Sequence, residues 1–591
     1  MKTPAQISLS VGLVLLISAI LRFWGIWENS FQYDELSAIF RARAVSWSEH
    51  WNFGILPDGH PPGVQTFLWI WLKVIGENPV PLHIFCALLS TLAVYFVYRA
   101  ALNLVGHQAA LLAIILYGFS YLPLSWSQQL RPYSFGMFFS TGLIWLWSSI
   151  IQKENKQQKG KFIVFGIIAG VCSYIHYFSA LLAGLLWLHA FLTNRIQFKN
   201  LLISAGIGIL VFLPSLPAFV HQFHGGGLDW LGKPTVSFIS DHLKQLFNVN
   251  PLLIVISIAI TLFLGPIPSK KTAFTLLLLF FIPMIVGFAW SLTVKPVLQH
   301  SVLVFSAPFI FIFCGSIFSN PKLWFFPYLW AFVTLFALVK SEFLTKTNVS
   351  GYQKQSANMA ETFRRDTSTT VLADGPDDII AYHLQRSKSP KQPSFISNRT
   401  TPFSYARLWS LCSSAVKSRK PIELALNSGS HPGIIPLLEH WTGKAAFRRS
   451  WIGAEYLTFN PSNREQNKIS YAKLQLDASG KIEIQLKKLN FQKNDVLVVQ
   501  IPDTTISDSL MLVSELLNGD NQFDFRSSKK VDFKQVGDGS LFLFIKTADI
   551  REVKENTTLK VHIENISIKK GIEIAIRCSK SNPYIYGLPC F

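Results

Sequence analysis

Long apolar blocks fill the chain from Met1 to about Val339, and most charged residues in that part are confined to short connections. A charged side chain at the centre of a bilayer costs on the order of 3 kcal/mol, which explains this separation. Beyond Val339 the composition becomes that of an ordinary soluble protein. The first part of the chain is therefore predicted to be a polytopic α-helical membrane region, followed by an extramembranous region.

About 20 apolar residues are needed to cross ~30 Å of hydrocarbon. The first apolar stretch has no small-residue cleavage site after it, so it is predicted to remain as a helix. The tryptophan-rich segment 63–75 is too short to cross and is predicted to lie at the membrane interface. About eleven spans are predicted, at 7–27, 81–99, 107–124, 134–151, 161–177, 178–194, 200–219, 251–268, 272–292, 300–318 and 322–340.

The distribution of Lys and Arg predicts the orientation. With the N-terminus inside, nearly every inner connection carries Lys or Arg, as in KENKQQKGK at 153–161. The alternate connections and the C-terminal half then lie on the extracytoplasmic side of the plasma or inner membrane. This topology depends on dividing 161–194 into two spans, because a single span would reverse everything downstream.

Three domains are predicted: membrane region 1–340, a small α/β domain at 341–460 and a β-sandwich at 461–591. The last follows from alternating runs such as KIEIQLK, which are typical of antiparallel strands. Cys578 and Cys590 fit either a disulfide or two free thiols. The formal net charge of +20 does not predict nucleic-acid binding, because the basic residues are scattered without an arginine-rich stripe.

The first outer connection carries an acidic pair, Asp34 and Glu35, a few residues beyond the first span. A helix-like pattern follows, so Asp34 is a candidate helix N-cap with Glu35 in the first turn. A carboxylate at the membrane surface can also accept a hydroxyl proton as a general base. The two roles are compatible, since a capping residue can still direct one oxygen at a substrate.

Further candidate residues lie in the outer connections. In HPPG at 60–63, Pro62 is suited to a first helical position, and His60 can bind a phosphate or a sugar hydroxyl. Arg131 and Tyr133 have a structural alternative as anchors of a helix in the membrane interface, and His176 has one as a buried neighbour of aromatic residues. A guanidinium suits a phosphate better than an ammonium does. These other candidates are Arg131, Tyr133, His176, Tyr177, Lys295 and His300.

The segment HQFHGGGLDWLGK at 221–233 has two His and one Asp, but no fixed third ligand that would predict a metal site. Its three consecutive glycines favour a mobile loop over a substrate. No metal and no cofactor are predicted.

Three motifs in this order resemble the GT-C glycosyltransferases. They are the acidic pair after the first span, His-Pro-Pro before an interfacial helix, and Ser-Gln-x-x-Arg-Pro-Tyr at the start of a later span. Within that superfamily they resemble the protein O-mannosyltransferase and aminoarabinose (lipid A) transferase group, which is glycosyltransferase family 39-like. The resemblance covers roughly residues 1–320, and the C-terminal part carries no such motif.

The resemblance implies transfer of one sugar from a polyprenyl-phosphate-linked donor to an extracytoplasmic acceptor, with inversion at the anomeric carbon. Asp34 then corresponds to the catalytic base and Glu35 supports it, while Arg131 and Tyr133 lie near the donor phosphate. The family often has Glu where this chain has Gln129. The expected partners are the donor, membrane lipids and an acceptor that is a lipid, a protein or a glycan.

Two other functions are compatible with the same sequence. A transporter or flippase of lipid-linked saccharides would line its path with intramembrane polar residues, yet few ionisable residues lie deep in the predicted spans. A membrane-anchored carbohydrate-binding protein would act through its C-terminal domains, but eleven spans exceed what a tether requires.

Overall fold

The computed structural model describes residues 4–151, 159–194, 197–225, 231–264, 269–318, 325–341, 350–451 and 453–463, followed by the strands β6 to β13 named below. The chain divides into two compact units, Met1–Val349 and Ser350–Phe591. The predicted glycine loop includes residues 226–230, which lie outside the described residues, as does Cys590.

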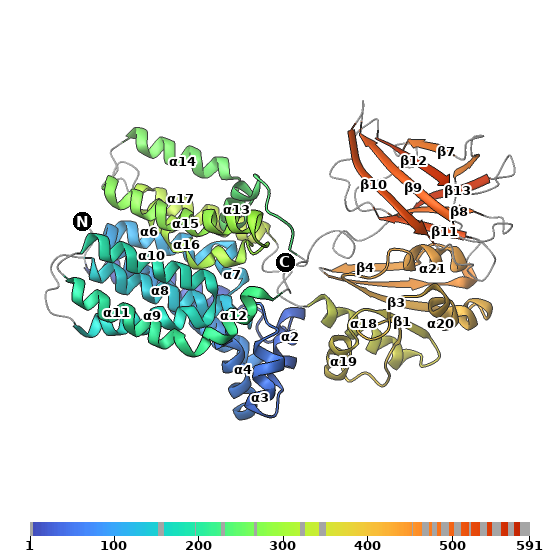
Figure 1. The fold of residues 1–591 in the computed structure, drawn as a ribbon, viewed down its shortest axis with the longest axis horizontal. Coiled ribbons are helices and arrows are strands. Elements are labelled where there is room, and N and C mark those ends of the chain that lie inside the picture. Colours follow the sequence, from blue (N-terminus) through green and yellow to red (C-terminus); the bar gives the residue numbers. More distant parts are fainter. Residues whose placement is uncertain are drawn as a thin grey trace. The chain divides into compact units, whose positions relative to one another are not determined.

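The first unit is a helical bundle whose long helices run side by side (Figure 1). Most of its buried side chains are apolar, with Trp147, Phe309 and Phe311 among the largest. Its elements are α1 (Pro4–Phe23), α2 (Tyr33–Ala42), α3 (Trp47–Glu49), η1 (His50–Ile55), α4 (Pro62–Val74), α5 (Pro79–Val105), α6 (His107–Phe119), α7 (Tyr121–Ser125), α8 (Pro132–Ile150), α9 (Lys159–Ile175), α10 (Tyr177–Thr193), α11 (Phe198–Phe212), η3 (Leu213–Ser215), α12 (Leu216–His224), α13 (Phe238–Phe247), α14 (Pro251–Leu264), α15 (Lys270–Thr293), η4 (Ser301–Phe305), α16 (Ala307–Phe318) and α17 (Phe326–Lys340).

Each predicted span contains a helix, and the predicted division of 161–194 into two helices is confirmed by the break at His176. Among the described residues, three helices are long and apolar enough to cross a membrane: Pro79–Val105, Phe198–His224 and Lys270–Thr293. A fourth is obtained if α13 and α14, bent by 81°, are counted as one broken span. The chain is thus a membrane protein by the length and composition of its helices, while the number eleven stays a prediction.

The connections predicted to be extracytoplasmic gather at one end of the bundle. Figure 1 shows α2, α3 and α4 at the end opposite the N-terminus, where α7, α12 and α13 also lie. The break between α9 and α10 carries His176, whose ring lies 5.4 Å from that of His60 at this end. The polar candidates of the sequence are therefore presented at one level of the bundle.

Helices α9 and α11 pack closely because glycines line their contact. A Cβ added at Gly166 would lie 2.4 Å from the backbone oxygen of Ser204, and one at Gly170 would lie 2.5 Å from the Cβ of Val211. Small residues four apart allow helix backbones to approach in a membrane. The close approach of α9 and α11 therefore depends on these two glycines.

Replacing Gly166 by Leu should force α9 away from α11 and destabilise the bundle by about 1–3 kcal/mol, the usual cost of overpacking. The thermal melting midpoint of the detergent-purified protein measures this change. Gly206→Leu is the matched control, because a Cβ at Gly206 on the same helix pair meets nothing within 4 Å. Equal midpoints for the two variants would contradict glycine-dependent packing.

The second unit begins with an α/β segment. Its sheet has the order β2-β1-β3-β5-β4; β1 pairs parallel with β2 and β3, and β5 pairs antiparallel with β3 and β4. Buried aliphatic residues of β3 and α21 form much of its core. The elements are α18 (Gly351–Arg365), β1 (Thr370–Asp374), α19 (Asp377–Arg386), β2 (Ser394–Ser397), α20 (Tyr405–Lys417), β3 (Ile422–Asn427), α21 (Ile434–Thr442), β4 (Phe447–Trp451), β5 (Ala454–Phe459) and η6 (Pro461–Asn463).

The remaining strands form two four-stranded antiparallel sheets, with the orders β10-β9-β12-β7 and β11-β8-β13-β6. The alternating runs of the sequence correspond to these strands, while their closure into a sandwich stays a prediction. The strands are β6 (Ala472–Gln475), β7 (Lys481–Gln485), β8 (Val496–Ile501), β9 (Leu510–Asn518), β10 (Gln522–Val531), β11 (Leu541–Lys546), β12 (Thr557–Glu564) and β13 (Glu573–Ser579).

Candidate functional site

The acidic pair lies in the first turn of α2, but the predicted cap is wrong. The N-cap residue is Gln32 and the helix begins at Tyr33, so Asp34 is its second residue. A helix N-terminus attracts negative charge, which stabilises both carboxylates there. The helix starts earlier than predicted because the carboxylate of Glu35 accepts a hydrogen bond of 2.7 Å from the backbone N–H of Gln32.

Glu35 is buried and joins three parts of the chain. Its Oε1 accepts hydrogen bonds from the backbone N–H of Leu130 at 2.6 Å and from Nε2 of His83 on α5 at 3.1 Å. Its Oε2 accepts the bond from Gln32. Both oxygens are therefore engaged by protein, and Glu35 fixes the start of α2 against the segment that ends in Arg131.

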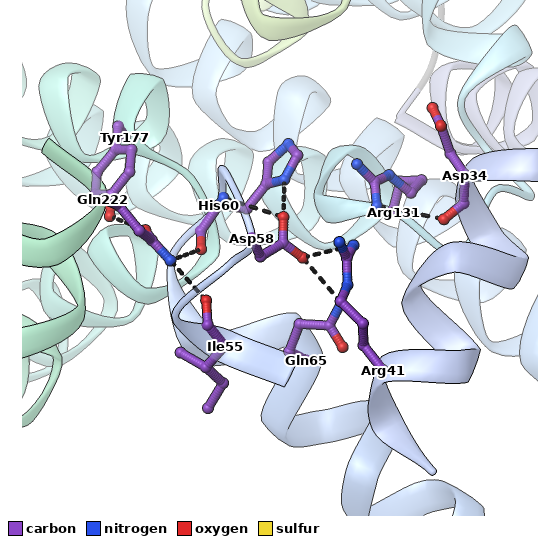
Figure 2. Close-up of polar contacts among 9 residues, drawn as sticks. All are labelled: Asp34, Arg41, Ile55, Asp58, His60, Gln65, Arg131, Tyr177 and Gln222. Carbon is purple, nitrogen blue, oxygen red and sulfur yellow. Dashed lines mark hydrogen bonds and ion pairs between the residues drawn. The ribbon is translucent and has the colours of Figure 1, made fainter. Parts of the chain in front are cut away.

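Asp34 is exposed, and Figure 2 shows its carboxylate pointing away from Arg131. Among the described residues, no hydrogen bond engages that carboxylate. Its backbone oxygen instead accepts a long bond of 3.5 Å from Nη1 of Arg131. Burial alone would lower the pKa of Arg131, but the charges of Asp58 and Asp34 outweigh it and raise that pKa. The exposed carboxylate of Asp34 therefore belongs to the residue whose backbone oxygen contacts the charged guanidinium of Arg131.

A buried carboxylate at the centre of the first connection was not predicted. Asp58 accepts a bond of 2.8 Å from Nδ1 of His60 and one of 2.9 Å from Nε2 of Gln65, and it forms an ion pair of 3.0 Å with Arg41 (Figure 2). Burial raises the pKa of Asp58, yet the hydrogen bond from His60 and the charges of Arg41 and Arg131 lower it well below its usual range. Asp58 is therefore an ionised acceptor that organises the connection around His60.

His60 belongs to a group of rings at the start of α8 and α10. Its ring centroid lies 5.4 Å from that of His176, which in turn lies 6.2 Å from Tyr133. The Tyr133 hydroxyl accepts a bond of 3.1 Å from Ser301. His176 is buried and its ring contacts both His60 and Tyr133.

Gln222 links the Tyr177 hydroxyl to the backbone oxygen of His60. The Tyr177 hydroxyl donates to Oε1 of Gln222 at 2.5 Å, and Nε2 of Gln222 donates to the backbone oxygens of Ile55 and His60 at 2.9 and 3.0 Å. Figure 2 shows this chain of contacts on the side of His60 opposite Arg131. Pro62 begins α4 as predicted, and this restricts the backbone that follows His60.

Lys295 and His300 have other contacts. The Lys295 ammonium donates to the backbone oxygens of Gln222, Phe223 and Gly225 at 3.1–3.3 Å, and so caps the end of α12. The His300 ring stacks on Phe238 at 4.3 Å, and burial lowers the pKa of His300. The structure therefore brings together His60, Arg131, Tyr133, His176 and Tyr177, with Lys295 joined to them through Gln222.

The described residues contain no group of three or more His, Cys, Asp or Glu that could hold a metal ion. Asp58 has its carboxylate oxygens occupied by His60, Gln65 and Arg41. What the site offers chemically is an exposed carboxylate, a guanidinium, a half-buried imidazole and tyrosine hydroxyls.

The bundle and this cluster define a multi-helix membrane protein with one polar, cation-containing site at one end. Residues 59–221 match the sequence model of the dolichyl-phosphate-mannose-protein mannosyltransferase family. The matched segment includes His60, Arg131, Tyr133, His176 and Tyr177. The resemblance inferred from the motifs is thereby confirmed: this part of the chain is similar to glycosyltransferases of that group. No curated protein matches the chain.

Solved structures of related enzymes resemble the chain at low identity. The S. cerevisiae protein O-mannosyltransferase complex bound to its sugar donor is 17% identical over 38% of this chain, with a TM-score of 0.28, and the chain spans 33% of its length. ArnT of Cupriavidus metallidurans in the apo state is 11% identical, with a TM-score of 0.46 and coverage of 78% of this chain and 98% of its own. The oligosaccharyltransferase AglB of Archaeoglobus fulgidus, in complex with an inhibitory peptide and dolichol-phosphate, is 9% identical, with a TM-score of 0.39 and coverage of 96% and 95%.

Proposed function

We propose that this protein is an inverting glycosyltransferase that moves one sugar from a polyprenyl-phosphate donor to an acceptor on the extracytoplasmic side of the membrane. The observation that carries this proposal is the meeting of Asp34, Arg131 and His60 at one end of an apolar bundle, within or next to the segment that matches the mannosyltransferase family. The extracytoplasmic orientation is supported by the Lys and Arg of the opposite connections.

The chemistry requires a base, a stabilised leaving group and no metal. The Asp34 carboxylate takes the proton of an acceptor hydroxyl, and that oxygen attacks the anomeric carbon from the face opposite the phosphate. The bond between the anomeric carbon and the phosphate oxygen breaks, and the lipid phosphate leaves with the electron pair. Arg131 stabilises the charge that develops on it, since a fixed guanidinium favours a phosphate oxygen bearing more charge.

The proposal is tested with the full-length protein reconstituted in vesicles that contain polyprenyl-phosphate sugars labelled in the sugar. A transferase passes the label to a water-soluble or lipid acceptor and leaves sugar-free polyprenyl phosphate in equal amount. A flippase moves the labelled lipid between leaflets without releasing that phosphate. Translocation with no cleavage would overturn the proposal in favour of transport.

Replacing Arg131 by Ala should raise the KM for the donor by about 10- to 100-fold, because a hydrogen bond to a charged group is lost. The KM for the acceptor should change little. Initial rates at varied donor and acceptor concentrations separate the two effects.

Arg43→Ala is the matched control for this variant, because Arg43 is a half-exposed guanidinium of the first connection that pairs only with Glu77, at 2.6 Å, among the charged groups described. It should leave both KM values unchanged. Equal losses for donor and acceptor in the Arg131 variant would contradict a phosphate-binding role.

A further inference from the structure

The contacts of the Asp58 carboxylate are with neighbouring protein groups, and besides the side chains named below Oδ1 accepts the backbone N–H of His60 at 3.3 Å. Its side chain is 5% exposed, against 18% for His60. Oδ1 accepts from Nδ1 of His60, and Oδ2 is bound by Gln65 and Arg41. A ligand can therefore reach the imidazole but not the carboxylate, which makes Asp58 a positioning residue.

The contact with Asp58 selects one tautomer of His60. An ionised carboxylate can only accept hydrogen bonds, so the proton of a neutral imidazole must lie on Nδ1. Arg41 supplies a counter-charge for the Asp58 carboxylate, so the carboxylate does not depend on a positive charge of the ring. The other ring nitrogen, Nε2, keeps its lone pair and is a hydrogen-bond acceptor.

No hydrogen bond of the described residues joins Nε2 of His60 to the neighbouring ring of His176. The ring of His176 meets it edge to face at 5.4 Å, and Nδ1 of His176 accepts the backbone N–H of Phe178 at 3.1 Å. The titratable and charged groups around His60 come from the first connection, α2, α8 and α10, and are Asp58, Arg41, Arg131, Tyr133, His176 and Tyr177.

We propose that His60 is a hydroxyl-binding residue, whose Nε2 accepts a hydrogen bond from a hydroxyl group of the transferred sugar or its acceptor, and that Asp58 holds it in the required tautomer. A phosphate oxygen would meet the lone pair of Nε2 with repulsion, so the phosphate is left to Arg131. This assignment rests on the proposed transferase function and divides its site into a phosphate part and a hydroxyl part.

The first experiment separates hydroxyl from phosphate recognition in the full-length enzyme. Sugar-free polyprenyl phosphate serves as a competitive inhibitor of transfer by wild type, His60→Ala and His60→Gln. Its inhibition constant should be the same for all three, while kcat/KM falls about 10- to 100-fold in His60→Ala and is partly restored by the acceptor oxygen of Gln. An inhibition constant raised five-fold or more by His60→Ala would assign His60 to the phosphate and overturn the proposal.

The second experiment identifies the hydroxyl. Deoxy analogues of the donor sugar and of the acceptor are compared in wild type and His60→Ala. Removal of the bound hydroxyl should lower kcat/KM in wild type but cause little further loss in the variant, because the two changes remove the same hydrogen bond. Additive losses for every analogue would exclude a hydroxyl contact.

The Asp58→Asn variant tests whether Asp58 sets the tautomer of His60. An Asn amide can donate to Nδ1, which turns Nε2 into a donor, so kcat/KM should fall about as far as in His60→Ala. Because its Nε2 no longer accepts, Asp58→Asn should also lose the discrimination against the deoxy analogue that lacks the bound hydroxyl. Glu77→Gln, at the ion pair with Arg43, is the matched carboxylate control. Lower activity in Asp58→Asn with discrimination against that deoxy analogue as large as in wild type would reduce Asp58 to a structural role.

Failure of this assignment is distinct from failure of the proposed function. A wild-type protein that never cleaves the donor would refute the transferase itself. A wild-type protein that transfers sugar, with His60 variants that lose phosphate affinity, would refute only the hydroxyl assignment.

Discussion

Asp34→Asn is expected to lower the rate of sugar transfer by about 10²- to 10⁴-fold, the usual contribution of a general base. The amide keeps the size of the side chain but cannot accept the proton of the acceptor hydroxyl. Donor binding should persist, because Arg131 contacts the backbone oxygen of Asp34 and not its carboxylate. Single-turnover transfer and donor affinity, measured on the same preparation, check the two halves of this expectation.

Glu77→Gln is the control for the loss of a carboxylate, since Glu77 pairs with Arg43 away from the site. It should transfer sugar at the wild-type rate. Because Asp34 is exposed and sits in the first turn of α2, its replacement by Asn should leave the thermal midpoint within a few degrees of wild type. Retained transfer in Asp34→Asn would remove Asp34 as the base and direct attention to His60.

Glu35→Ala is expected to cost about 3 kcal/mol or more of stability and to abolish transfer. The substitution leaves the backbone N–H groups of Gln32 and Leu130 and Nε2 of His83 without their acceptor in a buried place. Each unsatisfied buried donor costs about 1–3 kcal/mol. The thermal midpoint of the purified protein measures the loss of stability, and transfer assays well below that midpoint measure the loss of activity.

Glu35→Gln tests whether the carboxylate or only its shape is needed. The amide keeps one acceptor oxygen but places an NH₂ group toward Leu130 and His83 or toward Gln32, so an intermediate midpoint is expected. A midpoint for Glu35→Ala within two degrees of wild type would contradict the structural role. Full activity in Glu35→Ala would separate Glu35 from the site altogether.

The helices and the level of the site were predictable from sequence because apolar length and charged connections follow directly from the bilayer. The break at His176 was predicted from the length of the apolar stretch 161–194. The start of α4 was predicted from the suitability of Pro62 for the first helical position. The cap of α2 was not, because Glu35 bonds the backbone of Gln32 and so moves the helix start away from the residue that propensity favours.

The sequence did not predict the buried ion pair of Asp58 and Arg41, because the burial of a charged side chain depends on how the whole connection folds. Asp58 stands two residues before His60, and nothing in that spacing shows that Arg41 and Gln65 will cover its second oxygen. Lys295 likewise has the sequence position of a phosphate ligand, yet its ammonium caps the end of α12. An Asp preceding a predicted His-Pro-Pro turn is the one local signal that could have pointed to the pair.

The carboxylate of Glu35 has a consequence for how the reaction proceeds. Asp34 immediately precedes Glu35, and Arg131 immediately follows Leu130, whose backbone N–H the Glu35 carboxylate holds. The same carboxylate holds the start of α2 through the backbone N–H of Gln32. In the proposed reaction, the proton acceptor Asp34 and the cation Arg131 would therefore be preorganised relative to each other before any lipid arrives, so little reorganisation energy would remain to be supplied at the transition state. Substrate entry along the bilayer, and not assembly of the catalytic groups, is then the step that mutations elsewhere in the bundle should slow.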